Sequence, residues 1–197
     1  MECSVVHCQG CSKSFPTNEP RKHVILSLAI DNGETIEDAL AGYYRSEELE
    51  TLYACEDCDE TQRARKELAL NELPQLLVLQ LKRFTSNGAT KDPRPISFEC
   101  TLDVRDHSVA GTDGKYDLMA VLVHAGSELR RGHYYICVRF GEQWLKFNDS
   151  TVTPVSWDAV QKEQAYLLFY EKHVEDRQAR SASETVSLGA VLTATLV

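Results

Sequence analysis

Four of the seven cysteines lie in two C-x-x-C pairs, Cys8 with Cys11 and Cys55 with Cys58. This short spacing lets two sulfurs reach one tetrahedral Zn²⁺ at about 2.3 Å, and two pairs supply a closed, structural site. A redox dithiol is the alternative, but a redox C-x-x-C ordinarily accompanies a βαβ pattern. His7 offers a substitute ligand, although a solvent-facing imidazole is the simpler interpretation. We expect a structural zinc ion held by the four paired cysteines, between a short N-terminal knuckle and a second knuckle.

Composition and charge restrict the class of protein. The chain has 197 residues, 43% of them hydrophobic and 26% charged, which favours one globular domain with or without a tail. The net charge of −9 argues against a nucleic-acid partner held by a general phosphate-neutralising surface. No signal-peptide pattern follows Met1, and the apolar stretch 186–197 is shorter than the roughly 20 residues of a membrane span. We expect an intracellular protein, cytoplasmic or nuclear, with no membrane partner.

Hydrophobic periodicity predicts mostly strands. The pattern indicates an amphipathic helix from Glu34, extended by Tyr43 and Tyr44, and a second helical segment at 157–163. The near-continuous apolar run 73–84 is typical of a strand buried on both faces, placed centrally in a sheet. Further strands are expected at 24–30, 96–100, 116–124, 132–140, 143–147 and 165–170, with 61–70 as the return strand of a finger. The Lys82-Arg83 pair at the end of the apolar run is interpreted as solvated, and 173–197 as a flexible tail.

The most informative stretch contains His133 and Asn148 on two neighbouring predicted strands. An imidazole whose Nδ1 is oriented by an Asn or Asp oxygen forms the base half of a cysteine-nucleophile triad. Taken alone, a histidine on a strand is more often an ordinary half-buried side chain. The surrounding residues therefore decide between the two interpretations.

Those surroundings resemble the ubiquitin-specific proteases. Gly132-His133-Tyr134, Trp144 with Phe147-Asn148-Asp149, and the closing run 165–170 look like the histidine box of that family. The two C-x-x-C pairs followed by the run 73–84 are similar to its zinc-binding fingers and to the strand that leads back into the palm. The resemblance covers about residues 3 to 172 in the order of the family.

This resemblance implies an α+β, papain-like cysteine peptidase fold that hydrolyses the isopeptide bond after the C-terminal Gly-Gly of ubiquitin. Residues 1–72 would be mainly fingers and 73–172 mainly palm. His133 would be the general base, Asn148 the orienting residue and Asp149 a supporting polar residue. Cys8, Cys11, Cys55 and Cys58 would hold Zn²⁺, and the partners would be ubiquitin or ubiquitinated proteins.

One part of the family pattern is missing. The nucleophile box, with its Gly-Asn start and a cysteine at the head of a helix, has no counterpart, so the chain resembles the C-terminal part of the catalytic domain. Cys137 lies four strand residues from His133, about 13 Å away and beyond hydrogen-bond reach. Cys100 fits a small core residue, and Cys3 has no helix start to lower its pKa.

Three hypotheses remain. The first is a truncated part of a deubiquitinase, and the second is a catalytically inactive, zinc-containing module that binds ubiquitin or acts as a scaffold. The third, a zinc-ribbon adaptor, leaves the histidine box unexplained. If the thumb is absent, the palm face that it should cover is exposed, and we expect poor solubility or a need for a partner.

Overall fold

The computed structural model describes residues 2–16, 25–31, 33–109 and 114–174 of the chain. The secondary structure of these residues is mostly strand. The strands are β1 (Glu2–Cys8), β2 (Ser14–Pro16), β3 (Leu26–Leu28), β4 (Glu47–Glu48), β5 (Tyr53–Cys55), β6 (Glu60–Gln62), β7 (Ala64–Leu70), β8 (Leu76–Leu81), β9 (Thr101–Asp103), β10 (Lys115–Glu128), β11 (Arg131–Phe140), β12 (Gln143–Asn148), β13 (Thr151–Val155) and β14 (Ala165–Lys172). The helices are α1 (Ile36–Tyr43), α2 (Trp157–Val160) and one 3₁₀ turn, η1 (Arg105–His107).

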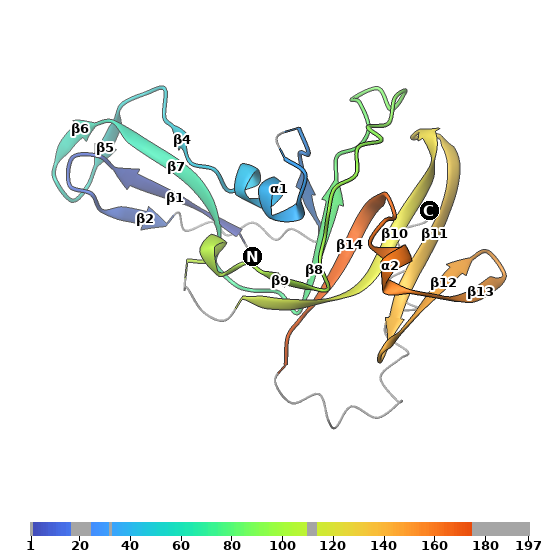
Figure 1. Ribbon diagram of the computed structural model, residues 1–197. Helices are drawn as coiled ribbons and strands as arrows, with labels where there is room; N and C mark the ends of the chain where they lie inside the picture. The colour runs from blue at the N-terminus through green and yellow to red at the C-terminus, as the bar shows by residue number, and fades with distance from the viewer. Residues whose placement is uncertain (1, 17–24, 32, 110–113, 175–197) are drawn as a thin grey trace.

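The N-terminal part forms an elongated finger, at the left of Figure 1. Its sheet has the order β2-β1-β7-β4, and β1 pairs with β7 antiparallel from Glu2 opposite Leu70 to Cys8 opposite Ala64. A separate hairpin of β5 and β6 completes the tip. The return strand predicted at 61–70 is therefore present as β7, which brings the two C-x-x-C pairs to the same end of the finger.

The second sheet carries the rest of the chain, at the right of Figure 1, with the order β13-β12-β11-β10-β14-β8-β3 and β9 alongside β10. Every pair is antiparallel except β3 with β8. The prediction for the apolar run is confirmed, because β8 lies between β14 and β3. Leu77, Val78 and Leu79 on its two faces are 3%, 6% and 0% exposed.

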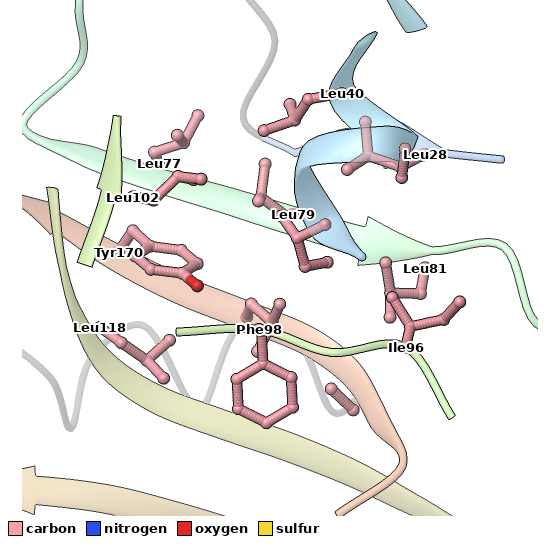
Figure 2. Close-up of a cluster of buried hydrophobic side chains, with 14 of the residues drawn as sticks. Leu28, Leu40, Leu77, Leu79, Leu81, Ile96, Phe98, Leu102, Leu118 and Tyr170 are labelled. Carbon is pink, nitrogen blue, oxygen red and sulfur yellow. The ribbon is translucent and has the colours of Figure 1, made fainter. Parts of the chain in front are cut away.

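Helix α1 covers one face of this sheet and encloses the main core. The helix begins with a capping box, in which the Thr35 hydroxyl accepts from the Asp38 amide and the Asp38 carboxylate accepts from the Thr35 amide. Its buried side, which includes Leu40, packs over β3 and β8, and Figure 2 shows Leu40 and Leu28 beside Leu79. Because helical spacing at 36, 39 and 40 matches the buried positions, the predicted helix is confirmed.

One predicted strand is wrong and one edge strand was not predicted, and both reflect backbone pairing that the pattern does not encode. Residues 96–100 form no regular strand, although Ile96 and Phe98 are buried as their alternation suggested. Ser97 instead pairs with the residues at the start of α1. Its backbone amide donates to the Glu34 carbonyl, and its backbone carbonyl accepts from the Ile36 amide. Sequence reasoning also missed β13, an edge strand that is mostly exposed and contains Pro154.

Arg83 is buried, so the expectation that the Lys82-Arg83 pair is solvated is wrong for Arg83. The residue is only 1% exposed. The guanidinium donates to the backbone carbonyls of Ala165 at 2.6 Å, Asp92 at 3.2 Å and Arg94 at 2.7 Å. Arg83 therefore ties β14 and the 92–94 segment to the end of β8, and the fixed fork of arginine donors suits this task.

Among the described residues, no helix is both long and apolar enough to cross a membrane. Of the tail predicted at 173–197, residues 175–197 lie outside the described residues.

Candidate functional site

His133 and Asn148 meet across the β11–β12 hairpin. The register pairs Ile136 with Phe147, so His133 lies near the start of β11 opposite the end of β12, where Asn148 follows Phe147. Nε2 of His133 is hydrogen bonded to Oδ1 of Asn148. Because an amide oxygen only accepts, Nε2 carries the proton in this contact. The two strands therefore select one tautomer of the imidazole.

The ring nitrogen that makes this contact differs from the expectation. The sequence argument assigned Nδ1 to the orienting residue, whereas the structure uses Nε2. Nδ1 is thereby the nitrogen with a free lone pair, and it is the atom that can take a proton from a thiol. Which nitrogen faces the partner depends on the ring torsion, and strand periodicity carries no information about that torsion.

Asp149 lies further from the His133 imidazole than Asn148 does. Its Oδ2 lies 3.9 Å from Nε2 of His133, and its side chain is 82% exposed. Asp149 has a left-handed backbone, with φ of 51°, directly after Asn148 at the β12–β13 turn. The His133 side chain itself is 45% exposed. The site is therefore open to solvent, and Asn148 rather than Asp149 is the close partner of the imidazole.

A hydrogen-bonded network steadies the same hairpin further along the strands. The Tyr135 hydroxyl donates to Glu163 at 2.6 Å, and the Lys146 ammonium lies 3.1 Å from the same carboxylate. The ammonium also lies 3.8 Å from the centre of the Tyr135 ring. Tyr135 lies two residues after His133, and Lys146 lies two residues before Asn148. Both therefore lie on the same face of the sheet as His133 and Asn148. The network joins β11 and β12 to the segment after α2, and thereby limits movement of the two site residues.

The structure describes all seven cysteines, and the three outside the knuckles are poor nucleophiles. Cys137 is fully buried, and burial raises the pKa of its thiol to about 11. Cys3 lies in β1 of the finger, 3% exposed, and burial raises its pKa as well. Cys100 lines a pocket with Trp144 and Trp157, and burial again raises its pKa. Since the thiolate is the reactive form, none of the three is activated.

Sequence reasoning missed His124, a buried histidine on β10. It is 1% exposed and pairs across the ladder with Tyr134, the neighbour of His133. The Phe84, Tyr134 and Tyr166 rings surround it, with centroids 5.2, 4.6 and 6.4 Å away. The only signal in the sequence was a histidine ending an otherwise apolar strand pattern, which does not distinguish a core position from a surface one.

The four paired cysteines form a candidate metal centre at the finger tip. Their sulfur atoms all lie within 4.8 Å of one another. Two separations between the knuckles are 3.9 Å, for Cys8 with Cys58, and 3.7 Å, for Cys11 with Cys55. A tetrahedron with metal–sulfur bonds of about 2.3 Å has edges of about 3.8 Å. The donor set and its spacing therefore fit a closed Zn²⁺ site.

The backbone of the two knuckles prepares this site. The residue after the second cysteine of each pair has a left-handed conformation, Ser12 with φ of 58° and Asp59 with φ of 56°. Backbone N–H groups at Cys58 and Asp57 point at the Cys55 sulfur and are among the causes that lower its pKa to about 7. Lys13 and Asp57 form an ion pair of 2.5 Å between the knuckles. Both knuckles thus hold their sulfurs in related local geometry, and the amides beside Cys55 favour the thiolate of that residue.

Comparison with known proteins identifies similar chains. The family model described as "Ubiquitin carboxyl-terminal hydrolase" matches residues 3–170. Ubiquitin carboxyl-terminal hydrolase 8 of Saccharomyces cerevisiae is 35% identical over 187 aligned residues. The alignment covers 86% of this chain and 39% of that protein. Ubiquitin carboxyl-terminal hydrolase 17-like protein B of Mus musculus is 37% identical, covering 83% of this chain and 35% of that protein. The chain thus spans less than half the length of these relatives.

Solved structures agree with the relatives. The SAGA DUB module of Ubp8, Sgf11, Sus1 and Sgf73 bound to monoubiquitin matches with a TM-score of 0.77 and 36% identity, over 88% of this chain and 40% of that chain. The same module bound to ubiquitin aldehyde matches with a TM-score of 0.76 and 34% identity. The expected α+β, papain-like fold is therefore confirmed, with the strand-rich sheets described above.

Proposed function

Because this chain belongs to the ubiquitin carboxyl-terminal hydrolase family, we propose that it supplies the base half of a cysteine-type deubiquitinase. The single observation that carries the proposal is the contact between Nε2 of His133 and Oδ1 of Asn148. That contact fixes the tautomer in which Nδ1 is a base, as a thiol nucleophile requires. Asp149, with an oxygen 3.9 Å from Nε2 of His133, is the supporting polar residue of this site.

The nucleophilic thiol comes from polypeptide outside these 197 residues, which we term the cysteine-bearing segment. Support comes from the raised pKa of Cys3, Cys100 and Cys137 and from the coverage of about two-fifths of the relatives. Nδ1 of His133 takes the thiol proton, and the thiolate adds to the carbonyl carbon of the last glycine of ubiquitin. The imidazolium then protonates the departing lysine amine as the C–N bond breaks. Water, deprotonated by Nδ1, hydrolyses the thioester and restores the thiol.

The ligand we propose is ubiquitin or a ubiquitinated protein. The matched solved structures hold monoubiquitin or ubiquitin aldehyde on a related fold, at 34% to 36% identity. The net charge of −9 suits a basic ligand segment, although charge alone identifies no contact. In this assignment residues 1–72 act mainly as fingers and 73–172 mainly as palm.

The metal we propose is a structural Zn²⁺ ion held by Cys8, Cys11, Cys55 and Cys58. The ion would supply cross-linking of the two knuckles and no step of hydrolysis, because four thiolates leave no open position. The spacing of the sulfur atoms supports it. The chain itself contributes the paired knuckle backbone and the sheet of β1 and β7 that brings the knuckles together.

A second candidate function follows from the cysteines. If no cysteine-bearing segment joins this chain, the three unactivated thiols favour an inactive module that binds ubiquitin without turnover. Titration of ¹⁵N-labelled chain with unlabelled ubiquitin tests the feature that both functions share. We expect amide shifts along the finger sheet and near His133, and unchanged spectra would contradict both.

A further inference from the structure

His124 is a buried polar side chain without a hydrogen-bond partner at either ring nitrogen among the described residues. The residue is 1% exposed, so water cannot replace the missing partners freely. An unsatisfied buried donor is costly, and such a group in a folded protein calls for an explanation. The proposed hydrolysis does not use this ring. The contacts of the His124 ring must therefore explain why a histidine is buried here.

The ring lies against Gly132, the residue that precedes His133. A Cβ built on Gly132 would collide with Nε2 of His124 and would lie 2.5 Å from its Cε1. A Cβ on Gly126, across the hairpin, would lie 3.0 Å from the same Cε1. The imidazole therefore occupies the volume that a side chain at position 132 would need, whereas a side chain at position 126 would first meet the backbone of Arg131 and Gly132, at 2.5 and 2.8 Å.

We propose that His124 is a positioning residue, whose ring fills the space beside Gly132 and so fixes the backbone from which His133 meets Asn148. The inference rests on the proposed role of His133 as the general base. Successive side chains of a strand point to opposite faces, so His124 and Tyr134 share one face of the sheet while His133 points to the other. Packing agrees, because Tyr134 and Tyr135 contact different hydrophobic clusters. His124 thus acts through the main chain and not by contact with the His133 ring.

The ring also acts as a neutral group. Burial lowers the pKa of His124, and the ammonium of Lys91 lowers it further. That ammonium donates to the His124 backbone carbonyl at 2.6 Å, and the remaining titratable neighbours are the hydroxyl-bearing rings of Tyr134 and Tyr166. No carboxylate stands among these contacts to favour a cation. A five-membered ring of this size, held neutral between three aromatic rings, fits the gap next to glycine.

Side-chain ¹⁵N spectra of the histidines in the full chain test the proposal without any need for turnover. In the parent chain we expect His133 to show one tautomer, protonated at Nε2. His124→Ala removes the ring, so we expect His133 to become a mixture of tautomers. His124→Leu fills a similar volume without nitrogen atoms, and should restore the single tautomer. If alanine prevents folding, His124→Val leaves a smaller void and is assessed in the same way.

Leu122→Ala is the matched control, because Leu122 lies two residues before His124 on β10, is 9% exposed and faces the same side of the sheet, where it pairs with Ile136 and not with Gly132. It should lower stability without altering the His133 signals. The proposal is overturned if folded His124→Ala or His124→Val leaves His133 unchanged, if Leu122→Ala disturbs it equally, or if folded His124→Leu fails to restore it. A parent chain in which His133 is not protonated at Nε2 would instead contradict the proposed function, so the two failures are distinguishable.

Discussion

The imidazole of His133 donates its Nε2 proton to Oδ1 of Asn148 across a two-stranded hairpin. The relationship needs only the register of β11 with β12, since neighbouring antiparallel strands place residues from both on one face. It leaves Nδ1 free to act as a base. The chain therefore presents an imidazole and its hydrogen-bonded amide partner on one sheet, while the four-cysteine knuckles lie at the far end of the finger.

Asn148→Ala should impair catalysis in the enzyme assembled from this chain and the cysteine-bearing segment. Loss of one oriented hydrogen bond, worth about 1–3 kcal/mol, predicts a rate reduction of roughly 5- to 150-fold in hydrolysis of a ubiquitin amide. Asn148→Asp keeps an acceptor and should retain most of the rate. Asp149→Ala is the matched control, because Asp149 is exposed and 3.9 Å away, and it should cost less than about fivefold. Equal losses for Asn148→Ala and Asp149→Ala would contradict the assignment of the orienting group.

Zinc content provides a test of the finger site. The purified chain should hold one zinc ion, and Cys58→Ser should lose it, as measured by metal analysis of the desalted protein. After chelation of the metal, limited proteolysis should cleave the β1–β7 finger sooner than the palm. The reason is that the metal cross-links two knuckles that have little hydrophobic core of their own. Cys100→Ser is the control and should keep the metal. Full zinc retention in Cys58→Ser would show that the four thiols do not act as one site.

Arg83→Ala should be strongly destabilising. The substitution leaves the carbonyls of Ala165, Asp92 and Arg94 without their donor and opens a cavity beside β8. We expect the free energy of unfolding to fall by about 3 kcal/mol or more, measured by urea denaturation. Arg130→Ala, at an exposed position, should change it by less than about 0.5 kcal/mol. A similar small change for both would contradict the structural role given to Arg83.

Stability should fall as the pH is lowered from 7 towards 5. Burial lowers the pKa of His124 and of His107, so between the folded and unfolded pKa values the unfolded chain binds more protons. Stability therefore rises with pH in that window, below the unfolded value of about 6.5, by at most about 1.4 kcal/mol per pH unit for each histidine. Denaturation of His124→Leu across the same range should show a smaller slope. An unchanged slope would mean that His124 is not held neutral by the fold.

The sequence predicted those parts of the fold in which the side-chain pattern reflects burial. The run 73–84 predicted a strand buried on both faces, and the helical spacing that follows Glu34 predicted a segment that is indeed a helix. The C-x-x-C spacing likewise placed four thiols together, because spacing within each pair is local information. The strand predicted at 96–100 is absent, because the alternation of apolar and polar residues reflects burial and not which backbone groups pair.

The finer parts of the site depend on geometry that spacing does not encode. Whether His133 offers Nδ1 or Nε2 to Asn148 follows from one side-chain torsion. The burial of Arg83 depends on carbonyls up to 82 residues away in the chain. The position of the His124 ring depends on Gly132 of the neighbouring strand, which leaves room for it. Each of these is a long-range contact, and a single sequence gives only the residue types that take part.

The most direct test of the central claim uses ubiquitin bearing a C-terminal cysteine-reactive electrophile, with intact mass as the measurement. The zinc-loaded 197-residue chain alone should give no adduct, because Cys3, Cys100 and Cys137 are buried or unactivated. Adding the cysteine-bearing segment should produce one adduct on that segment, and His133→Ala should abolish or greatly slow it. A His133-dependent adduct on Cys3, Cys100 or Cys137 of the isolated chain would contradict the account, since the nucleophile would then lie within these residues.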